Sequence, residues 1–123
     1  MFYVRIYVDA DGESHFEDVE VELRPMQFAP PAPPLDLSTF WPAAQYGFVH
    51  AASDWTGDWH PTPHRQLRLV IAGESEDEVS DGTVRRFGPG SVTLMEDTTG
   101  KGHHSRPIGE LYVCMVQLPD SAP

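Results

Sequence analysis

The side chains of this sequence best suited to chemistry are histidines, and they gather in two short stretches. The first stretch holds His60 and His64, where Pro61 and Pro63 favour an extended backbone for the residues before them. In an extended segment, every second side chain points to the same face. If the extension continues, one face carries His60, Thr62, His64, Gln66 and Arg68.

The second stretch, His103 and His104, follows the glycine-rich loop 100–102. Imidazole is a common ligand of divalent transition metals, so two histidine sources on separate strands that face one interior could hold such an ion. The spacing alone fits equally well with histidines that lie at the surface or form hydrogen bonds in loops. The residues leave both interpretations open.

Arg68 is unusual because it stands in an otherwise apolar segment, 66–72, on the same predicted face as Gln66. An arginine in such a strand must reach water, a carboxylate or a ligand. The favoured explanation is an internal Asp or Glu partner, and the functional alternative is a bound anionic substrate. The two-residue repeat of a strand predicts that Arg68 faces the interior.

The elements that would position these side chains are short strands joined by turns. Alternating or continuous apolar residues predict strands over seven segments: 2–8, 19–23, 46–50, 66–72, 84–87, 91–95 and 111–118. The acidic run 74–80 is interpreted as a strand with a solvated face. About eight short strands with turn residues between them predict a single all-β domain, either a closed barrel or a double sheet.

Prolines are too dense over 25–34 for a helix or a central strand, which predicts an extended connector lying over the domain. Residues 119–123 are expected to form a loose tail. The strand over 2–8 is long and apolar for a sheet edge, and unpaired edges favour strand addition. The sequence therefore predicts a symmetric homodimer.

Charge and composition exclude several classes of protein. Eight basic residues against 19 acidic ones give a net charge of −11, which opposes binding to nucleic acid or to anionic membranes. No apolar run approaches the roughly 20 residues of a membrane span, and the first residues show no signal peptide. Cys114 is the only cysteine, so an internal disulfide is excluded. We expect a cytoplasmic protein.

The segment from Gly57 onward resembles the paired motifs of the cupin superfamily. The first cupin motif has a His-x-His and then a Glu seven residues before a glycine. Here Gly73 is that glycine, Gln66 falls on the Glu position, and residues 60–62 fall on His-x-His. The second motif matches Gly82, residues 88–90 and His103. Residues 87–90 with 96–103 are similar to a group of small, single-domain bacterial cupins without an assigned activity.

The resemblance implies a jelly-roll β-barrel, also called a double-stranded β-helix, with core motifs over 57–118. Residues 1–56 would supply N-terminal strands, the proline-rich connector and a segment that covers the barrel mouth. The family pattern implies a divalent metal, such as Fe, Mn, Ni or Zn, held by three histidines and a glutamate. Only His60 and His103 match cleanly, because Thr62 and Gln66 replace the other two ligands.

His64 could replace the missing imidazole, and Asp97 or Glu96 could supply an anion. The expected metal ligands are thus His60, His64, Gln66 and His103, and the expected substrate contacts are Gln66, Arg68 and Trp59. Trp41, Trp55 and Trp59 also fit simple packing at the barrel mouth.

Three functions are consistent with this resemblance. The first is a small-molecule-binding barrel that is a metal-dependent enzyme of dioxygenase or isomerase type, acting on a small, carboxylated substrate. The second is a non-catalytic binding or sensing cupin that has lost metal chemistry, which the changes at Thr62 and Gln66 favour. The third is a structural dimeric module whose pocket is filled by side chains.

Overall fold

The computed structural model describes residues 1–120 and is built from nine strands, with no helix in that range. The strands are β1 (Phe2–Val8), β2 (Ser14–Glu20), β3 (Arg24–Met26), β4 (Leu35–Leu37), β5 (Gln45–Ala51), β6 (Gln66–Val79), β7 (Val84–Phe87), β8 (Val92–Met95) and β9 (His103–Gln117). The all-β prediction is confirmed. Residues 121–123 of the predicted tail lie outside the described range. Within residues 1–120, no helix is long and apolar enough to span a membrane.

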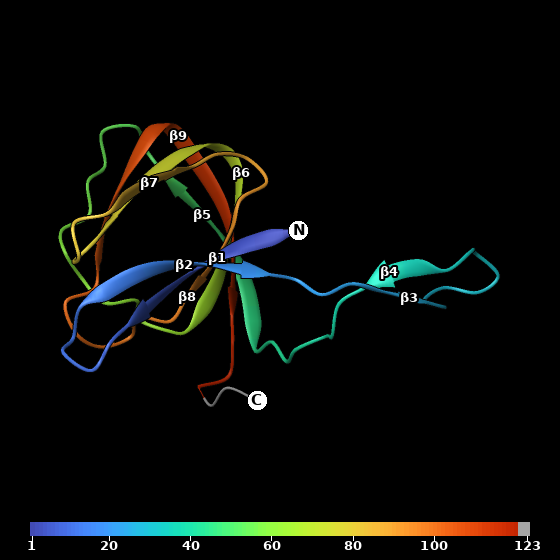
Figure 1. The fold of residues 1–123 in the computed structure, drawn as a ribbon. Helices are drawn as coiled ribbons and strands as arrows, with labels where there is room; N and C mark the ends of the chain where they lie inside the picture. The colour runs from blue at the N-terminus through green and yellow to red at the C-terminus, as the bar shows by residue number, and fades with distance from the viewer. Residues whose placement is uncertain (121–123) are drawn as a thin grey trace.

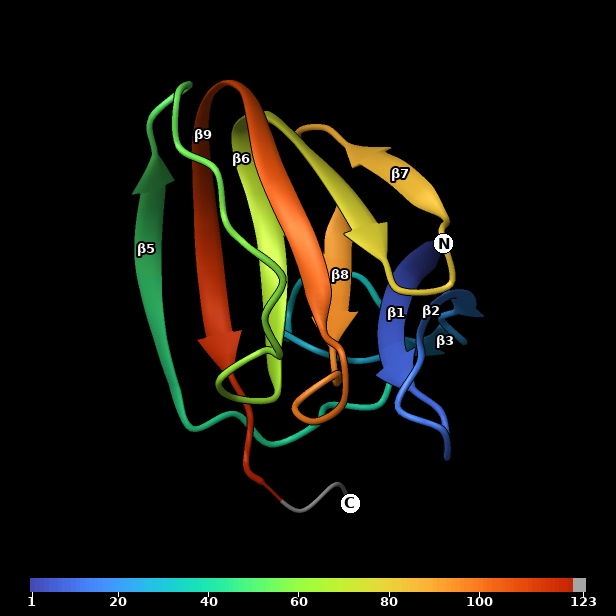
Figure 2. The same cartoon turned by 90° about the vertical axis from the view of Figure 1, so that its left-hand side faces the viewer.

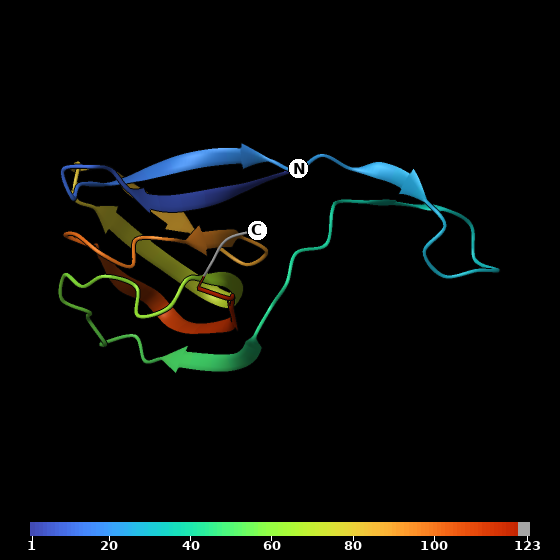
Figure 3. The ribbon, with the colours of Figure 1, turned by 90° about the horizontal axis from the view of Figure 1, so that it is seen from below.

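Seven strands form one mixed sheet in the order β2-β1-β8-β6-β9-β5, with β7 paired to β6 (Figure 2). The β1–β8 pair is parallel, and the other pairs are antiparallel. The sheet curves around its interior, but its two end strands, β2 and β5, do not pair with each other (Figure 3). The fold is therefore an open, curved sheet and not the closed barrel that the sequence suggested.

The long strands β6 and β9 allow the sheet to curve. The first part of β6 pairs with β8 and its last part pairs with β7, while β9 follows β6 along most of its length. Register shifts interrupt the β6–β9 ladder between Val70 and Glu74. Gly73 has a φ of +77° there, and a Cβ at this position would overlap the carbonyl of Glu110. Glycine is therefore required where the two strands bend together.

Two apolar clusters fill the interior of the sheet. One contains Val70, Phe87, Leu111 and Val113, and the other contains Ile6, Val79 and Met95. Along β6, Gln66, Arg68 and Val70 are buried, whereas Leu67 and Leu69 on the other face are half-buried. This alternation confirms the prediction that Arg68 faces the interior.

Three strand predictions differ from the structure. β2 begins at Ser14, earlier than the predicted 19–23, because the turn at 9–13 returns the chain directly onto β1. β9 begins at His103, earlier than the predicted 111–118, so His103 and His104 belong to a strand. β1 lies between β2 and β8, so it is not a sheet edge and cannot carry the predicted strand addition.

The proline-rich segment forms a separate two-stranded ribbon, in which β3 pairs with β4. Figures 1 and 3 show that this ribbon projects away from the main sheet. The prediction of a connector lying over the domain was therefore wrong. The antiparallel pairing of β3 with β4 keeps the segment extended in a hairpin of its own.

Candidate functional site

A cavity of about 440 Å³ opens between β5, β6, β9 and the segment that leads into β6. The polar residues that line it are His50, Asp54, His60, Thr62, Gln66, Arg68, Ser75, His103 and Ser105. Its apolar wall consists of Val49, Ala51, Met95, Leu111, Val113 and Met115. This combination of an apolar wall and a few converging polar groups is typical of a small-molecule site.

His60 and His103 come together because their backbones form an isolated antiparallel bridge. The amide of each residue donates to the carbonyl of the other, at 3.1 and 3.0 Å. Their rings lie on the same side of the bridge, with centroids 4.9 Å apart. Gly102 makes this approach possible, because a Cβ at this position would overlap the His60 backbone.

The ring of His103 is held by Asp97, and both side chains are buried. His103 Nδ1 lies 2.6 Å from Asp97 Oδ2, while the Thr62 hydroxyl donates to Asp97 Oδ1 at 2.7 Å. A carboxylate accepts hydrogen bonds, so Nδ1 carries the proton in neutral His103. This leaves the lone pair on Nε2.

His60 has the same tautomer for a similar reason. Its Nδ1 lies 2.7 Å from the backbone carbonyl of Asp58, which only accepts hydrogen bonds. Both histidines of the cavity thus have Nδ1 occupied and Nε2 free to meet a ligand. His103 is 2% exposed while His60 is exposed, so His103 forms the deep part of the polar wall and His60 the outer part.

Arg68 forms a buried ion pair with Asp77. Its two Nη atoms lie 3.2 and 2.5 Å from the carboxylate oxygens of Asp77, and Ser75 and Ser105 also donate to that carboxylate. Within residues 1–120, the buried Nε of Arg68 has no hydrogen-bond partner. The internal carboxylate partner predicted for Arg68 is confirmed.

The pKa of Asp77 reflects competing effects. Burial raises the pKa, but the positive charge and hydrogen bonds of Arg68, with those of Ser75 and Ser105, outweigh burial. The pKa of Asp77 is therefore below its ordinary value, and the carboxylate stays charged beside Arg68. The cavity wall contains a neutralised pair at this point and not a free cation.

The predicted site residues do not all meet. His60, Gln66, Arg68 and His103 line the cavity, but His64 is exposed and lies outside it because the chain bends at 63–64. Trp59 also lies outside the cavity, near His104, whereas Trp55 lines it. His64 and Trp59 are therefore not brought together with the other predicted site residues in this cavity.

The two acidic alternatives have different positions. Asp97 does turn inward, but its oxygens are occupied by Thr62 and His103. Glu96 instead accepts hydrogen bonds from Arg5 and Arg65, at 2.5 and 2.6 Å. Neither carboxylate lines the cavity.

Sequence reasoning missed Asp77, which it assigned to a solvated strand face. The inward-facing positions of β6 are Gln66, Arg68 and Val70 before the bulges, but Ser75, Asp77 and Val79 after them. The bulges thus move the buried face from even to odd positions. The only available signal was the need of Arg68 for a carboxylate.

The donor set for a metal ion is incomplete. No group of three His, Cys, Asp or Glu side chains within residues 1–120 is placed to hold a metal. His60 and His103 offer two imidazoles, and Gln66 adds a neutral amide oxygen in the same cavity. These residues therefore do not reproduce the three-histidine, one-carboxylate site that the cupin resemblance implies.

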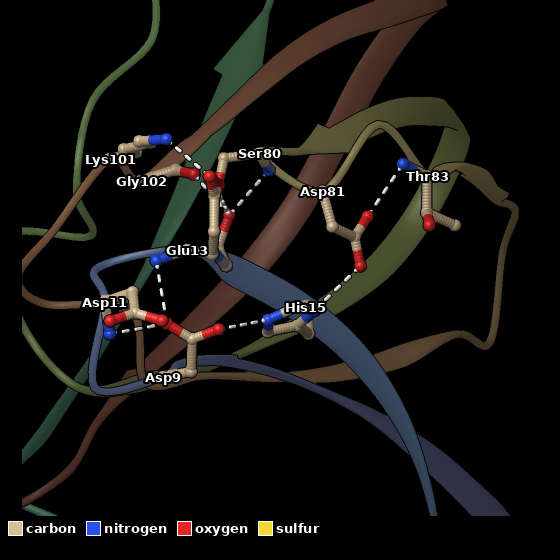
Figure 4. Close-up of polar contacts among 10 residues, drawn as sticks. Asp9, Asp11, Glu13, His15, Ser80, Asp81, Thr83, Lys101 and Gly102 are labelled. Carbon is tan, nitrogen blue, oxygen red and sulfur yellow. Dashed lines mark hydrogen bonds and ion pairs between the residues drawn. The ribbon is translucent and has the colours of Figure 1, made fainter.

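A second polar cluster surrounds His15 (Figure 4), and none of the residues labelled there lines the cavity. His15 lies between Asp9 and Asp81, at 2.7 and 2.8 Å, and so connects the β1–β2 turn with the β6–β7 turn. Hydrogen bonding to Asp9 and then to Asp81 raises the pKa of His15. His15 therefore has a structural role, because these contacts join two hairpins.

Comparisons with known proteins give a fold relationship. No family model matches the chain, and no curated protein matches it. The chain is similar to the crystal structure of protein NMB1881 from Neisseria meningitidis, with 13% sequence identity and a TM-score of 0.51. The similarity covers 68% of this chain and 89% of that chain. At this identity, the likeness concerns the fold alone.

Proposed function

We propose that this protein is a cupin-type, small-molecule-binding protein whose ligand occupies the cavity between β5, β6 and β9. The observation that carries the proposal is the cavity of about 440 Å³, lined by His60 and His103, whose Nδ1 atoms are both hydrogen-bonded within the protein. The adjoining apolar residues suit a ligand with a hydrocarbon part. The match of His60, Gly73, residues 88–90 and His103 to the cupin motifs supports the cupin-type assignment.

The charges of the wall favour a neutral ligand over a carboxylated one. Both Nη atoms of Arg68 already bond to Asp77, so a ligand carboxylate would have to displace a buried, hydrogen-bonded partner. The other polar groups of the wall are hydroxyls, an amide, imidazoles and the carboxylate of Asp54, which would repel a carboxylated ligand. A neutral molecule with hydroxyl or carbonyl groups fits these donors and acceptors.

The test is native mass spectrometry of protein purified without an affinity tag, followed by a thermal-shift screen of neutral and carboxylated fragments. We expect a co-purifying or stabilising neutral molecule whose effect disappears in Ala51→Trp, which fills the cavity from β5. Phe2→Trp, on β1 and outside the cavity, is the matched control. If no molecule raises the melting temperature of the wild type more than it raises that of Ala51→Trp, the binding function is rejected.

A second candidate is a metal-dependent enzyme that holds Fe, Mn, Ni or Zn through His60, His103 and Gln66. The observation that favours it is the fixed Nδ1 of both histidines, because a hydrogen-bonded Nδ1 orients Nε2 toward a metal. Two imidazoles and a neutral amide supply no negative ligand, so binding should be weak.

Titration calorimetry with Mn²⁺, Ni²⁺ and Zn²⁺ tests this second candidate. Gln66→Glu adds a carboxylate at nearly the same size and should tighten binding at least tenfold, or about 1.4 kcal/mol. His103→Ala should weaken binding, and His64→Ala is the control because His64 lies outside the cavity. If Gln66→Glu and His103→Ala both leave the affinity unchanged, the metal candidate is dropped.

A further inference from the structure

The projecting ribbon carries large apolar side chains that its own chain leaves exposed. We define the arm as residues 24–40, which contain β3 and β4. Met26, Phe28, Leu35 and Phe40 of the arm are each 53–71% exposed, and the Phe28 and Phe40 rings lie 5.9 Å apart. An isolated two-stranded ribbon is at best marginally stable in water. The arm therefore needs a surface to pack against.

The edge strand β5 is a second apolar surface without a cover. Within residues 1–120 it pairs only with β9, so its other edge presents backbone groups that no described strand pairs with. Tyr46 and Phe48 share one face of β5 and are 74% and 73% exposed. The arm leads directly into this strand, so both surfaces belong to one stretch of the chain (Figure 3).

This stretch is almost free of charge in a strongly acidic protein. Between residues 25 and 49 the only Asp, Glu, Lys or Arg is Asp36, although the whole chain has a net charge of −11. Two copies of such a chain repel each other over most of their surfaces. They can approach along residues 25–49 without that repulsion, and interface centres are typically poor in charged residues.

We propose that a second copy of this chain covers these surfaces, with the arm of each protomer packed on β5 of its partner. The contact is then made twice, which is what the two-fold symmetry of a closed dimer requires. A large side chain has roughly 150–250 Å² of surface. Because the four arm residues, Tyr46 and Phe48 are each 53–74% exposed, together they expose about 700 Å² per copy. Two copies would bury about 1,400 Å², within the range of stable interfaces of roughly 1,200–2,000 Å².

Sedimentation velocity of the full chain provides the first test. The wild type should sediment as a dimer in the micromolar range. Phe40→Asp on the arm and Phe48→Asp on β5 should each give monomers, while circular dichroism shows an unchanged β fold. Phe2→Asp is the matched control because Phe2 is 64% exposed on β1, and this variant should remain dimeric.

Mixing the two monomeric variants tests which surfaces meet. A mixed dimer pairs the intact arm of the Phe48→Asp copy with the intact β5 of the Phe40→Asp copy, so one of the two contacts is restored. The mixture should therefore contain dimers that neither variant forms alone. A contact between two arms, or between two β5 strands, gives no such recovery.

Four results would overturn the proposal. A wild type that is monomeric throughout would mean that the arm packs on its own chain or stays free. Dimers that survive both Phe40→Asp and Phe48→Asp would place the interface elsewhere, as would loss of the dimer in Phe2→Asp. A mixture that stays monomeric would exclude the arm-to-β5 contact. None of these outcomes depends on ligand binding in the cavity.

Discussion

Single side chains set the electrostatics of the cavity, above all the buried Arg68 and Asp77. Removing one partner of a buried ion pair leaves the other charge without compensation. Asp77 is fully buried and holds Arg68 through two hydrogen bonds, while Ser75 and Ser105 complete the coordination of its carboxylate. The pair therefore makes the polar wall rigid, although it contributes no net charge to a ligand.

We predict that Asp77→Asn lowers the free energy of unfolding by about 3–5 kcal/mol, because Arg68 then stays buried without a counter-charge. Urea denaturation at neutral pH measures this change. The double variant Arg68→Met/Asp77→Leu should lose less, since it leaves no buried charge. A single variant no less stable than the double variant would contradict this account.

The Arg68–Asp77 pair also makes the stability of the protein depend on pH. The folded-state pKa of Asp77 is lowered, so its stabilising effect is present above the ordinary Asp pKa of about 3.9 and is lost as the pH falls through the folded pKa. In Arg68→Met, burial acts without the opposing charge, so the folded-state pKa of Asp77 should shift upward and the loss of stability in acid should shrink or reverse. Unfolding curves of both proteins between about pH 3 and pH 7 check this shift.

Elements, and in particular turns and bulges, decide which side chains meet. The sequence predicted β1, β7 and most of β5 and β8 correctly, because their alternation and flanking glycines are local signals. It also placed Arg68 inside and His60 near His103. It could not place Asp77, because the bulges near Gly73 exchange the two faces of β6.

Non-local contacts account for the other differences. The bend at 63–64 turns His64 away from the cavity, and the local sequence predicted continued extension there. Strand order also depends on pairing between distant segments, so the interior position of β1 was not predictable from its own residues. The direction of the arm has the same origin, since nothing in the proline-rich segment specifies what it packs against.

Gly102, directly before β9, affects the site because it allows the bridge between His60 and His103. We predict that Gly102→Ala lowers the free energy of unfolding by more than about 3 kcal/mol, since a Cβ overlaps the His60 backbone at a φ of +73°. Gly82 is the matched control, with a φ of +92° and open space around it. Gly82→Ala should cost only about 1–2 kcal/mol, from the left-handed backbone alone. Equal losses in urea denaturation would argue against a close approach at Gly102.

His15 should make the junction of two hairpins sensitive to pH. Its folded-state pKa is raised by Asp9 and Asp81, so its stabilising effect is fully present below the ordinary His pKa of about 6.5 and is lost as the pH rises through the folded pKa. We predict that the melting temperature falls between about pH 6 and pH 9 and that His15→Gln reduces this fall. His104→Gln, outside the cluster, is the control. An identical pH profile in His15→Gln would refute the prediction.

Residues 1–120 divide into a curved main sheet and an arm whose strands pair only with each other in that range. The core clusters and the cavity walls all come from the main sheet and from the segments at its open end, whereas the arm supplies none of them. Arg24 and Leu37 are paired across the base of the ribbon, so their Cα atoms are about 4.5–5.5 Å apart. A two-residue turn can therefore replace everything between them.

We predict that replacing residues 25–36 with Asn-Gly, which favours a tight hairpin turn, leaves the main sheet folded. The free energy of unfolding of the monomer should change by less than about 1 kcal/mol, because no core side chain is removed. Ligand binding in the cavity should persist, while the dimer proposed above should be lost, since each copy then lacks most of its arm. Circular dichroism with urea denaturation measures the stability of the main sheet, and sedimentation velocity measures the loss of the dimer.

A shortened protein that unfolds would show that the arm belongs to the fold of the main sheet. One that stays dimeric would show that residues 25–36 do not hold the two copies together.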